Sequence, residues 1–198
     1  KICVIPKPYQ QPHPPFWQPF AVSERTIRRT AQRNIVPWIL TSLPLNFRDL
    51  CQIYKDEANK SGRAIGLGES IGAVRSVYFG RTYEEAFELG LQSTGIGFHH
   101  YFGAFGFVEP FRNPDDPEQK PLTFPTERAT FQRMVDHDFV ILGTVDDVKR
   151  KIESLARCHG NGALEWFGWS LGQGFMPMDE IREQLDLFVS HIIPEFKD

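Results

Sequence analysis

Short apolar runs and longer amphipathic stretches alternate along this chain. Four runs rich in aromatic and β-branched residues have the character of strands buried in a parallel sheet; they cover residues 16–22, 35–41, 71–80 and 163–169. Each run leads into a stretch whose apolar residues recur every three or four positions, which indicates a helix that packs by one face. Four strand–helix units in succession predict a parallel α/β sheet.

The predicted helices begin at side chains that can accept hydrogen bonds from first-turn amides. These caps are Ser23, Asn46, Thr82, Thr126 and Thr144. Thr82 is followed three residues later by Glu85, the spacing of a capping box. The last helix is predicted to bury an apolar stripe made of Ile181, Leu185, Phe188 and Ile192. A short apolar run at 139–142 is not counted as a further strand–helix unit.

The alternation breaks between residues 95 and 125, where glycines, prolines and aromatic residues replace the helical pattern. Long connections without secondary structure are usually functional or disordered. The composition predicts a mobile aromatic lid followed by a solvated acidic turn around Asp115 and Asp116. His99 and His100 lie in the lid, but sequence neighbours seldom bind one metal and no further ligand stands at a suitable spacing. We interpret them as pocket or loop residues and predict no metal site.

The first strand runs directly into a helix at Ser23, and this junction is the main candidate for binding chemistry. A capped helix start presents free amides and the positive end of the helix dipole, which suits a phosphate. Thr26 is near enough to offer a second hydroxyl, and Arg25 adds positive charge. An ordinary helix start has the same local pattern, so the spacing alone does not separate the two interpretations.

Three stretches around and beyond this junction resemble the bacterial luciferase-like family of flavin-dependent monooxygenases. They are a proline-rich lead-in at 6–15 followed by Ser-x-x-Thr at 23–26, the segment Gly-Thr-Val-Asp-Asp-Val at 143–148, and the tail at 185–196. The resemblance runs over nearly the whole chain. It implies an α/β fold of the (β/α)8 TIM-barrel type, in which residues 1–198 form the carboxyl-terminal half of a single domain. This half would supply the last four strand–helix units, with residues 95–125 inserted after the third.

The resemblance also implies a cofactor and a reaction. Ser23 and Thr26 take the positions that help bind the phosphate of FMN, or of a related deazaflavin, beside Ala21 and Val22 at the end of the strand. The implied enzyme uses reduced FMN, supplied by a flavin reductase, and O2 to oxidise an apolar or carbonyl-containing small molecule. A flavin carries its own redox chemistry, so the protein need only bind, orient and exclude water.

Barrels of this type place their sites at the carboxyl ends of the strands. That rule selects residues 21–23, 41–42, 80–82 and 170–173, with Glu165, Trp166 and Trp169 as further lining from the last strand. They include no nucleophile–base pair and no carboxylate dyad, so the sequence names no catalytic residue. Three alternatives stay open: a deazaflavin-dependent oxidoreductase, a non-catalytic flavin or ligand carrier on the same fold, and a phosphate-binding barrel of sugar metabolism.

Composition narrows the expected setting. The chain has 198 residues, 41% hydrophobic and 24% charged, which is ordinary for one globular domain. A net charge of -3 favours neither nucleic acid nor an anionic membrane as partner, and no apolar run approaches the ~18 residues of a membrane span. The three cysteines lack Cys-x-x-Cys spacing, which argues against a disulfide scaffold or a zinc site and makes a reducing cytoplasm the expected location.

The number of strand–helix units is half of what a closed barrel needs, and the chain goes from Lys1 at once into strand-like residues. We therefore expect an open, curved, four-stranded sheet with helices on its convex side. Ile39, Val77 and Trp166 are predicted to lie on the uncovered face. An exposed apolar face with free strand edges requires a partner, either an amino-terminal half of the barrel or a second copy of the chain.

Overall fold

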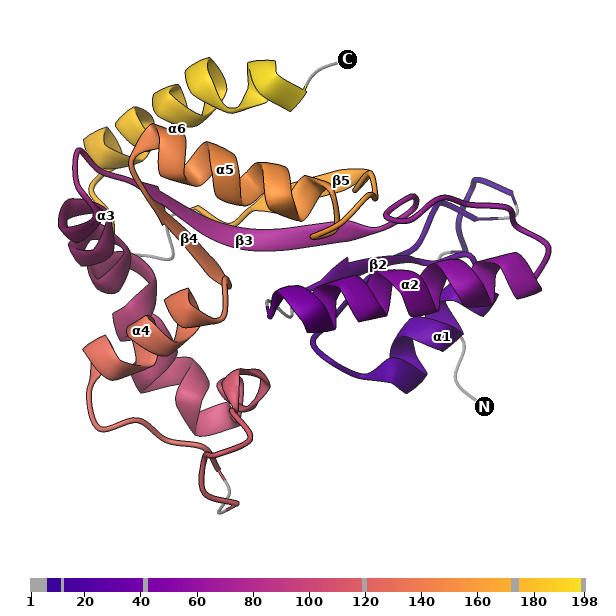
Figure 1. Cartoon of the computed structure of the whole chain (residues 1–198), viewed down its shortest axis with the longest axis horizontal. Helices are drawn as coiled ribbons and strands as arrows, with labels where there is room; N and C mark the ends of the chain where they lie inside the picture. The colour runs from indigo at the N-terminus through magenta and orange to yellow at the C-terminus, as the bar shows by residue number, and fades with distance from the viewer. Residues whose placement is uncertain (1–6, 12, 41–42, 119–120, 172–174, 197–198) are drawn as a thin grey trace.

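A computed structural model of the chain describes residues 7–11, 13–40, 43–118, 121–171 and 175–196. Its centre is a parallel sheet of five strands: β1 (Trp17–Phe20), β2 (Val36–Ile39), β3 (Gly72–Phe79), β4 (Val140–Gly143) and β5 (Trp166–Trp169). The order is β1-β2-β3-β4, and β5 also pairs with β3. Figure 1 shows the long β3 crossing the middle of the molecule, with β2 toward one end and β4 toward the other. The predicted parallel α/β sheet is confirmed.

Helices follow the strands in chain order. The α-helices are α1 (Glu24–Gln32), α2 (Pro44–Lys60), α3 (Tyr83–Gly90), α4 (Glu127–Asp136), α5 (Val145–Ala156) and α6 (Met178–His191). The shorter helical segments are η1 (Leu91–Gly95), η2 (Phe98–Phe102), η3 (Gly103–Phe105), η4 (Glu109–Phe111) and η5 (Ile193–Phe196). In Figure 1, α1 and α2 lie together beside β2, while α5 and α6 lie near β3 and β5. No helix in the described part of the chain is long and apolar enough to cross a membrane.

β3 is bonded along both of its edges. β2 and β5 pair with the same residues at its start, so they lie on opposite edges. The Ser76 and Gly80 amides donate toward β4, whereas the Arg75 carbonyl points the other way and accepts from the residue after β5. β4 therefore pairs with the same edge of β3 as β2 does. Beyond β5, the side-chain amide of Gln184 binds the amide and the carbonyl of Phe79, at 2.8 and 3.0 Å. A side chain therefore extends the pairing where the strand beside β3 ends.

β4 is a strand that the sequence analysis did not count. All four of its residues are buried, and the Phe139 carbonyl just before it accepts from the Ser76 amide at 3.2 Å. The apolar run is too short to predict a strand from the sequence alone. Its four residues form a strand because they pair with β3. The sheet thus has five described strands, where four were expected; β1, β2, β3 and β5 are the predicted ones.

Capping side chains fix most of the helix starts as expected. Three threonine hydroxyls each accept from the amide three residues further on; these are Thr82, Thr126 and Thr144. The assignment of Asn46 as the cap of α2 is wrong, because the helix begins two residues earlier, at Pro44, after Leu43. Proline suits the first helical turn, where its fixed φ is already helical and its missing N–H has no partner to lose.

The first core cluster lies between the sheet and helices α1, α2 and α5. Its sheet residues are the alternate positions that point toward the helices: Phe20, Ile39, Ala73, Val77, Phe79 and Ile141. Ile39 and Val77 are fully buried there, so their predicted place on the uncovered face is wrong. Successive side chains of a strand point to opposite faces, and the expectation chose the wrong alternate for both residues.

The opposite face of the sheet carries three tryptophans, which we call the tryptophan face: Trp17 of β1, Trp38 of β2 and Trp166 of β5. The ring of Trp17 lies 5.0 Å from that of Trp38 and 5.2 Å from that of Trp166. Glycines make room for them, since a Cβ on Gly72 or Gly168 would lie 2.8 or 2.7 Å from the Trp38 ring. Trp17 and Trp166 are 46% and 42% exposed, and Trp166 lies on the uncovered face, as predicted.

The contact between Trp17 and Trp166 also reports the shape of the sheet. β2 and β3 lie between β1 and β5, and neighbouring strands are about 4.8 Å apart. In a flat sheet the two tryptophans would start roughly 14 Å apart, too far for rings whose centroids are 5.2 Å apart. The sheet therefore curves toward the tryptophan face, and α1, α2 and α5 cover its convex side, as expected.

The segment between residues 95 and 125 is more regular than the expected loop. α3 continues into the π-helical segments η1 and η2 and then into the 3-10 turns η3 and η4. These segments and α4 form a second core cluster against β3 and β4, which includes Phe98, Phe111 and Phe131. The aromatic residues that suggested a lid are thus partly core residues. The proposed role as a lid stays a prediction.

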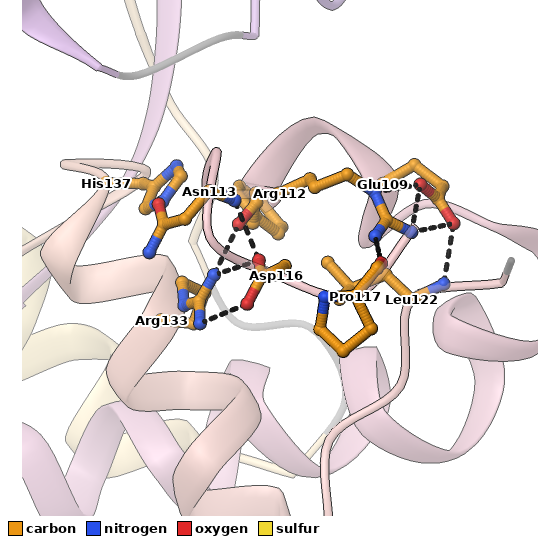
Figure 2. A network of polar contacts seen from close by, with 9 residues as sticks. Glu109, Arg112, Asn113, Asp116, Pro117, Leu122, Arg133 and His137 are labelled. Atoms are coloured by element: carbon orange, nitrogen blue, oxygen red, sulfur yellow. Dashed lines mark hydrogen bonds and ion pairs between the residues drawn. The ribbon is translucent and has the colours of Figure 1, made fainter. Parts of the chain in front are cut away.

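The acidic turn after η4 is held by charged side chains (Figure 2). Arg133 of α4 binds Asp116 at 2.6 Å and donates to the Phe111 carbonyl at 3.0 Å. Glu109 accepts from Arg112 at 3.0 Å and from the Leu122 amide at 2.6 Å. The Asp116 side chain is only 13% exposed, so the expectation of a solvated turn is wrong for this residue.

α6 turns an unexpected residue toward the sheet. Gln184 is 2% exposed, whereas Leu185, which was expected in the buried stripe, is 40% exposed. Phe188 and Ile192 pack in the first core cluster, as predicted. The buried stripe is therefore offset by one residue in its middle turn, where Gln184 reaches the edge of β3.

Candidate cofactor site at the carboxyl edge of the sheet

The junction between β1 and α1 has the geometry of a capped helix start. Ser23 is the N-cap, with extended backbone angles of φ -76° and ψ 108°. Its hydroxyl accepts from the Thr26 amide at 3.3 Å, and its carbonyl accepts from the Thr26 and Ile27 amides at 3.0 and 3.1 Å. The amides of the first two helical residues, Glu24 and Arg25, have no carbonyl to bind within the helix. The Ser23 hydroxyl and these two amides can bind an anion.

The charges beside Ser23 are arranged along α1. Glu24 opens the helix, but its carboxylate is bound by Arg28 one turn later, at 2.6 Å. Arg28 also contacts Glu57 of α2 at 3.3 Å, and its hydrogen bond to Glu24 is the main reason why its pKa is raised. Arg25 is exposed. Pairing with Arg28 reduces the repulsion that Glu24 would exert on an anion at the helix start.

The predicted binding residues lie at the carboxyl end of β1 and in the first turn of α1. Ala21 and Thr26 are half-buried, while Val22 and Ser23 are exposed. The end of β2 is adjacent, because the Leu40 amide donates to the Phe20 carbonyl at 3.0 Å. Residues 41–42 and 172–173, which were also selected from the sequence, lie outside the described residues. The structure confirms Ser23 as the helix cap, and phosphate binding there stays a prediction.

A groove of about 1310 Å³ lies at the carboxyl ends of β3 and β4, between α3 and α6. Phe79, Leu89, Met176 and Leu187 give it apolar walls. Five glutamates also line it: Glu84, Glu85, Glu88, Glu180 and Glu183. Arg81, the one cation among its described lining residues, is paired with Glu85 at 2.7 Å. This charge disfavours a phosphate, so the start of α1 is the better anion site, and the groove suits a ligand with an apolar part that carries no negative charge.

The last strand contributes less to this edge than expected. Trp169 faces the helices, because its ring stacks on Phe188 of α6 at 4.5 Å and its indole N–H donates to the Val77 carbonyl at 3.1 Å. Glu165 accepts from the Ser70 amide at 2.7 Å, at the amino end of β5. Trp166 belongs to the tryptophan face. These three residues are therefore not brought together at the carboxyl edge.

A buried hydroxyl cluster beside the groove was missed by the sequence analysis. The Tyr78 hydroxyl of β3 donates to the Ser93 hydroxyl at 3.2 Å and also hydrogen-bonds to Thr94. Burial raises the pKa of Tyr78. Ser93 and Thr94 lie in the π-helical segment η1, and such segments are frequent at functional sites. No local pattern marks a tyrosine on one strand and hydroxyls on the following helix as partners.

The two adjacent histidines have separate partners. His99 hydrogen-bonds to the Thr130 hydroxyl at 2.8 Å, and His100 to the Glu127 carboxylate at 2.7 Å. Both lie in η2 and contact α4, so they join the insertion to that helix. Within the described ranges, no group of three His, Cys, Asp or Glu side chains is arranged to hold a metal ion.

Curved parallel strands, helices on the convex side and a capped helix start at the carboxyl edge define part of a TIM-type barrel. No protein-family model matches the chain, and no curated protein matches its sequence. Solved structures of luciferase-like monooxygenases and related reductases do match its fold, which confirms the predicted resemblance at the level of the fold.

One such structure is the monooxygenase RslO1 from Streptomyces bottropensis, with a TM-score of 0.67 and 17% identity over 98% of this chain and 51% of the other. A second is the oxygenating constituent of 3,6-diketocamphane monooxygenase from Pseudomonas putida, a type II Baeyer-Villiger monooxygenase in complex with FMN. Its TM-score is 0.69, with 17% identity over 93% of this chain and 50% of the other.

A third is the coenzyme F420-dependent tetrahydromethanopterin reductase from Methanopyrus kandleri, with a TM-score of 0.60 and 18% identity over 92% of this chain and 51% of the other. The chain thus spans about half the length of the structures it matches.

Proposed function

We propose that this protein acts as a flavin-dependent monooxygenase that uses reduced FMN and O2 to oxidise an apolar or carbonyl-containing small molecule. The observation that carries this proposal is the Ser23-capped start of α1 at the carboxyl edge of a half-barrel. The half-barrel has the fold of structures that include an FMN complex of a monooxygenase. Flavin supplies the redox chemistry when bound, so the described residues need only position it and keep water out.

The residues present fit one side of a phosphate site. The Ser23 hydroxyl and the Glu24 and Arg25 amides would hold the phosphate, and the positive end of the α1 dipole would favour its charge. The groove between α3 and α6 is a separate space, whose apolar walls would receive the substrate and whose glutamates would exclude an anionic one. The phosphate would thus bind at the start of α1 and the substrate in the groove, at two separate places along the carboxyl edge of the sheet that differ in charge.

A deazaflavin-dependent oxidoreductase is the second candidate. Two solved structures with this fold are F420-dependent: the tetrahydromethanopterin reductase from Methanopyrus kandleri, and a secondary alcohol dehydrogenase in complex with an F420–acetone adduct. Both cofactors carry a phosphate, and the start of α1 alone does not distinguish between them. A deazaflavin does not serve oxygenation, so the choice of cofactor also decides the reaction class.

The proposed function needs partners. A flavin reductase would supply reduced FMN to the monooxygenase. The tryptophan face would pack against further strand–helix units like those that complete the matching structures, whose chains are about twice as long. A second copy of the chain is the other way to cover it.

Cofactor binding tests the proposal directly. Titration of the purified chain with FMN and with riboflavin, followed by flavin fluorescence, should show tighter binding of FMN. Ser23→Ala should weaken FMN binding by on the order of 1–2 kcal/mol, because one hydrogen bond to a charged group is lost. Riboflavin lacks the phosphate, so its affinity should not change. Ser190→Ala, at an exposed position of α6, is the matched control.

Equal effects of Ser23→Ala on FMN and riboflavin would exclude Ser23 from the phosphate site. Oxygen uptake with photoreduced FMN and a panel of ketones, aldehydes and alkanes then tests the reaction. Binding of F420 but not FMN would replace the monooxygenase with the second candidate. Stable FMN binding without oxygenation of any substrate would instead indicate a flavin carrier.

A further inference from the structure

The two outer strands of the sheet, β1 and β5, run in the same direction. β1 pairs in parallel with β2, and β5 pairs in parallel with β3; neither has a second neighbour among the described strands. A second copy, turned by half a rotation about the axis of the curved sheet, would place its β1 beside β5 and its β5 beside β1, both in parallel. The strands β1, β2, β3 and β5 of two copies together give the eight that close a barrel of this type.

In that arrangement α1 of one copy lies beside α6 of the other, because these helices follow the two strands that meet. The flank of α1 that faces α2 is fixed by Arg28 and Gln32, which bind Glu57 of α2 at 3.3 and 2.6 Å. With 3.6 residues per turn, the opposite flank carries Arg29 and Arg33. Both arginines are exposed, and neither forms an ion pair with a residue that the structure describes. They are free to bind a second copy.

α6 has an exposed apolar stripe next to its core face. The stripe consists of Met178, Leu185 and Val189, which are 61%, 40% and 54% exposed and share one side of the helix by their spacing. Asp179 and Asp186 border it on the outer surface. The groove between α3 and α6 lies along the other flank of the helix. The apolar stripe is therefore on the flank that would face α1 of a second copy.

The two helices have opposite charge. α1 with its C-cap carries four arginines and one glutamate, whereas α6 carries four carboxylates and one arginine. That arginine, Arg182, is paired with Asp179 at 3.3 Å on the surface. Arginine stems can cover apolar surface while the guanidinium groups bind carboxylates, so Arg29 and Arg33 can pack over the apolar stripe and reach Asp186. Within one chain α1 and α6 lie on opposite sides of the molecule (Figure 1), so only a second copy brings these surfaces together.

We propose that two copies of this chain close a two-fold symmetric barrel, in which β5 of each copy pairs with β1 of the other and α6 of each packs on α1 of the other. The tryptophan faces of both copies then lie inside the barrel. The contact between α1 and α6 occurs twice, as two-fold symmetry requires. A second copy is the occupant that the structure favours, because one chain carries both of the complementary surfaces. This proposal concerns assembly and does not depend on the cofactor.

Charge reversal tests the contact between α1 and α6. Sedimentation equilibrium of the wild-type chain should show a dimer that does not grow further with concentration. Arg29→Glu/Arg33→Glu makes both contacting flanks acidic, and Asp179→Arg/Asp186→Arg makes both basic. Each variant alone should dimerise at least about a hundredfold more weakly, because like charges meet at both contacts. An equimolar mixture of the two variants should again form dimers, with one chain of each kind, because opposite charges then meet at both contacts.

Arg48→Glu/Lys60→Glu, at two exposed positions of α2, is the matched control. α2 follows the inner strand β2 and meets no second copy in this arrangement, so the control should dimerise like the wild type. A wild-type chain that stays monomeric would overturn the proposal and leave the sheet edges to further strand–helix units. Growth beyond two chains would overturn closure. Reversals without effect, or a mixture that stays monomeric although circular dichroism shows both variants folded, would exclude the contact between α1 and α6.

Discussion

At the scale of single residues, an ion pair joins the acidic turn of the insertion to α4. Arg133 holds Asp116 at 2.6 Å, and the Asn113 amide also donates to that carboxylate at 2.7 Å. These bonds hold the pKa of Asp116 at about 2, with Arg133 as the main cause. His137 of the same network hydrogen-bonds to the Asn113 side chain at 2.9 Å, as Figure 2 shows. The turn and α4 are therefore joined by charge.

We predict that Asp116→Asn lowers the free energy of unfolding at pH 7 by roughly 1.5–3 kcal/mol, the cost of a lost hydrogen bond to a charged group. Because the pKa of Asp116 is depressed in the folded state, its carboxylate stabilises the folded protein at pH values above the ordinary carboxyl pKa of 3.8. This stabilisation is lost as the pH falls through about 2. Urea unfolding at pH 7 and at successively lower pH values should show the free energies of unfolding of the wild type and Asp116→Asn becoming equal as the pH falls from 3.8 through about 2.

Asp115→Asn is the matched control, because the Asp115 side chain is exposed one position away. It should change stability by no more than about 0.5 kcal/mol. An equal loss from both substitutions would mean that the general charge of the turn matters and the Arg133 contact does not.

At the scale of elements, α6 completes the sheet with a side chain. Gln184 is 2% exposed and binds both backbone groups of Phe79 at the end of β3. Buried backbone groups without partners are costly, and β5 stops before it reaches them. Gln184 is therefore polar, although it lies on the buried face of α6, because the backbone groups of Phe79 need hydrogen-bond partners.

We predict that Gln184→Met, which keeps the length of the side chain, destabilises the protein by roughly 2–4 kcal/mol. It leaves one buried donor and one buried acceptor unpaired, and such groups cost about 1–3 kcal/mol each. Hydrogen exchange should show a specific loss of protection at the Phe79 amide. Leu185→Met, at the exposed neighbouring position, should leave that amide protected, and continued protection in Gln184→Met would contradict the proposed pairing.

Local patterns predicted the elements whose causes are local. Thr82 and Thr144 were recognisable as caps because a cap acts within one helical turn. β4 was missed because its four residues become a strand only by pairing with β3. Leu185 was wrongly placed in the core because an apolar repeat carries no information about the strand end that Gln184 satisfies. Each error concerns a residue whose environment comes from a distant part of the chain.

At the scale of the whole molecule, one face of the sheet is covered by α1, α2 and α5, while the opposite face is covered by α3 and α4 only at the end of β3 and at β4. The convex side is covered by helices, while the tryptophan face leaves Trp17 and Trp166 46% and 42% exposed. Exposed apolar patches of this kind mark interaction sites. Among the described strands, β1 and β5 each pair on one side only. A partner that covers the tryptophan face can therefore also pair with the free edges of β1 and β5.

We predict that the purified chain associates with itself through the tryptophan face when no other partner is present. Sedimentation velocity should show weight-average mass rising with concentration. Trp166→Lys should weaken the association by roughly 2 kcal/mol, the loss typical of a central interface tryptophan. Tyr101→Lys, at an exposed aromatic residue of the insertion, should leave it unchanged. A wild-type chain that stays monomeric at every concentration would contradict this use of the face.

The candidate site was predictable only where it is contiguous in sequence. Ser23 and Thr26 could be found because strand, cap and first turn follow one another within a few residues. The groove between α3 and α6 and the Tyr78 hydroxyl cluster could not be found in this way. Each is assembled from segments that the sheet topology brings together, and no pattern in a single sequence encodes that proximity.

The pairing of β3 sets an order of events during synthesis on the ribosome. Gln184 is 105 residues downstream of Phe79, and Trp169 donates to Val77 across 92 residues. At about 5–20 residues per second, one edge of β3 waits roughly 5–20 s for its partners after the strand has been made. During that interval a half-paired apolar strand is open to aggregation, so the growing chain has its greatest need of a chaperone between the synthesis of β3 and that of α6.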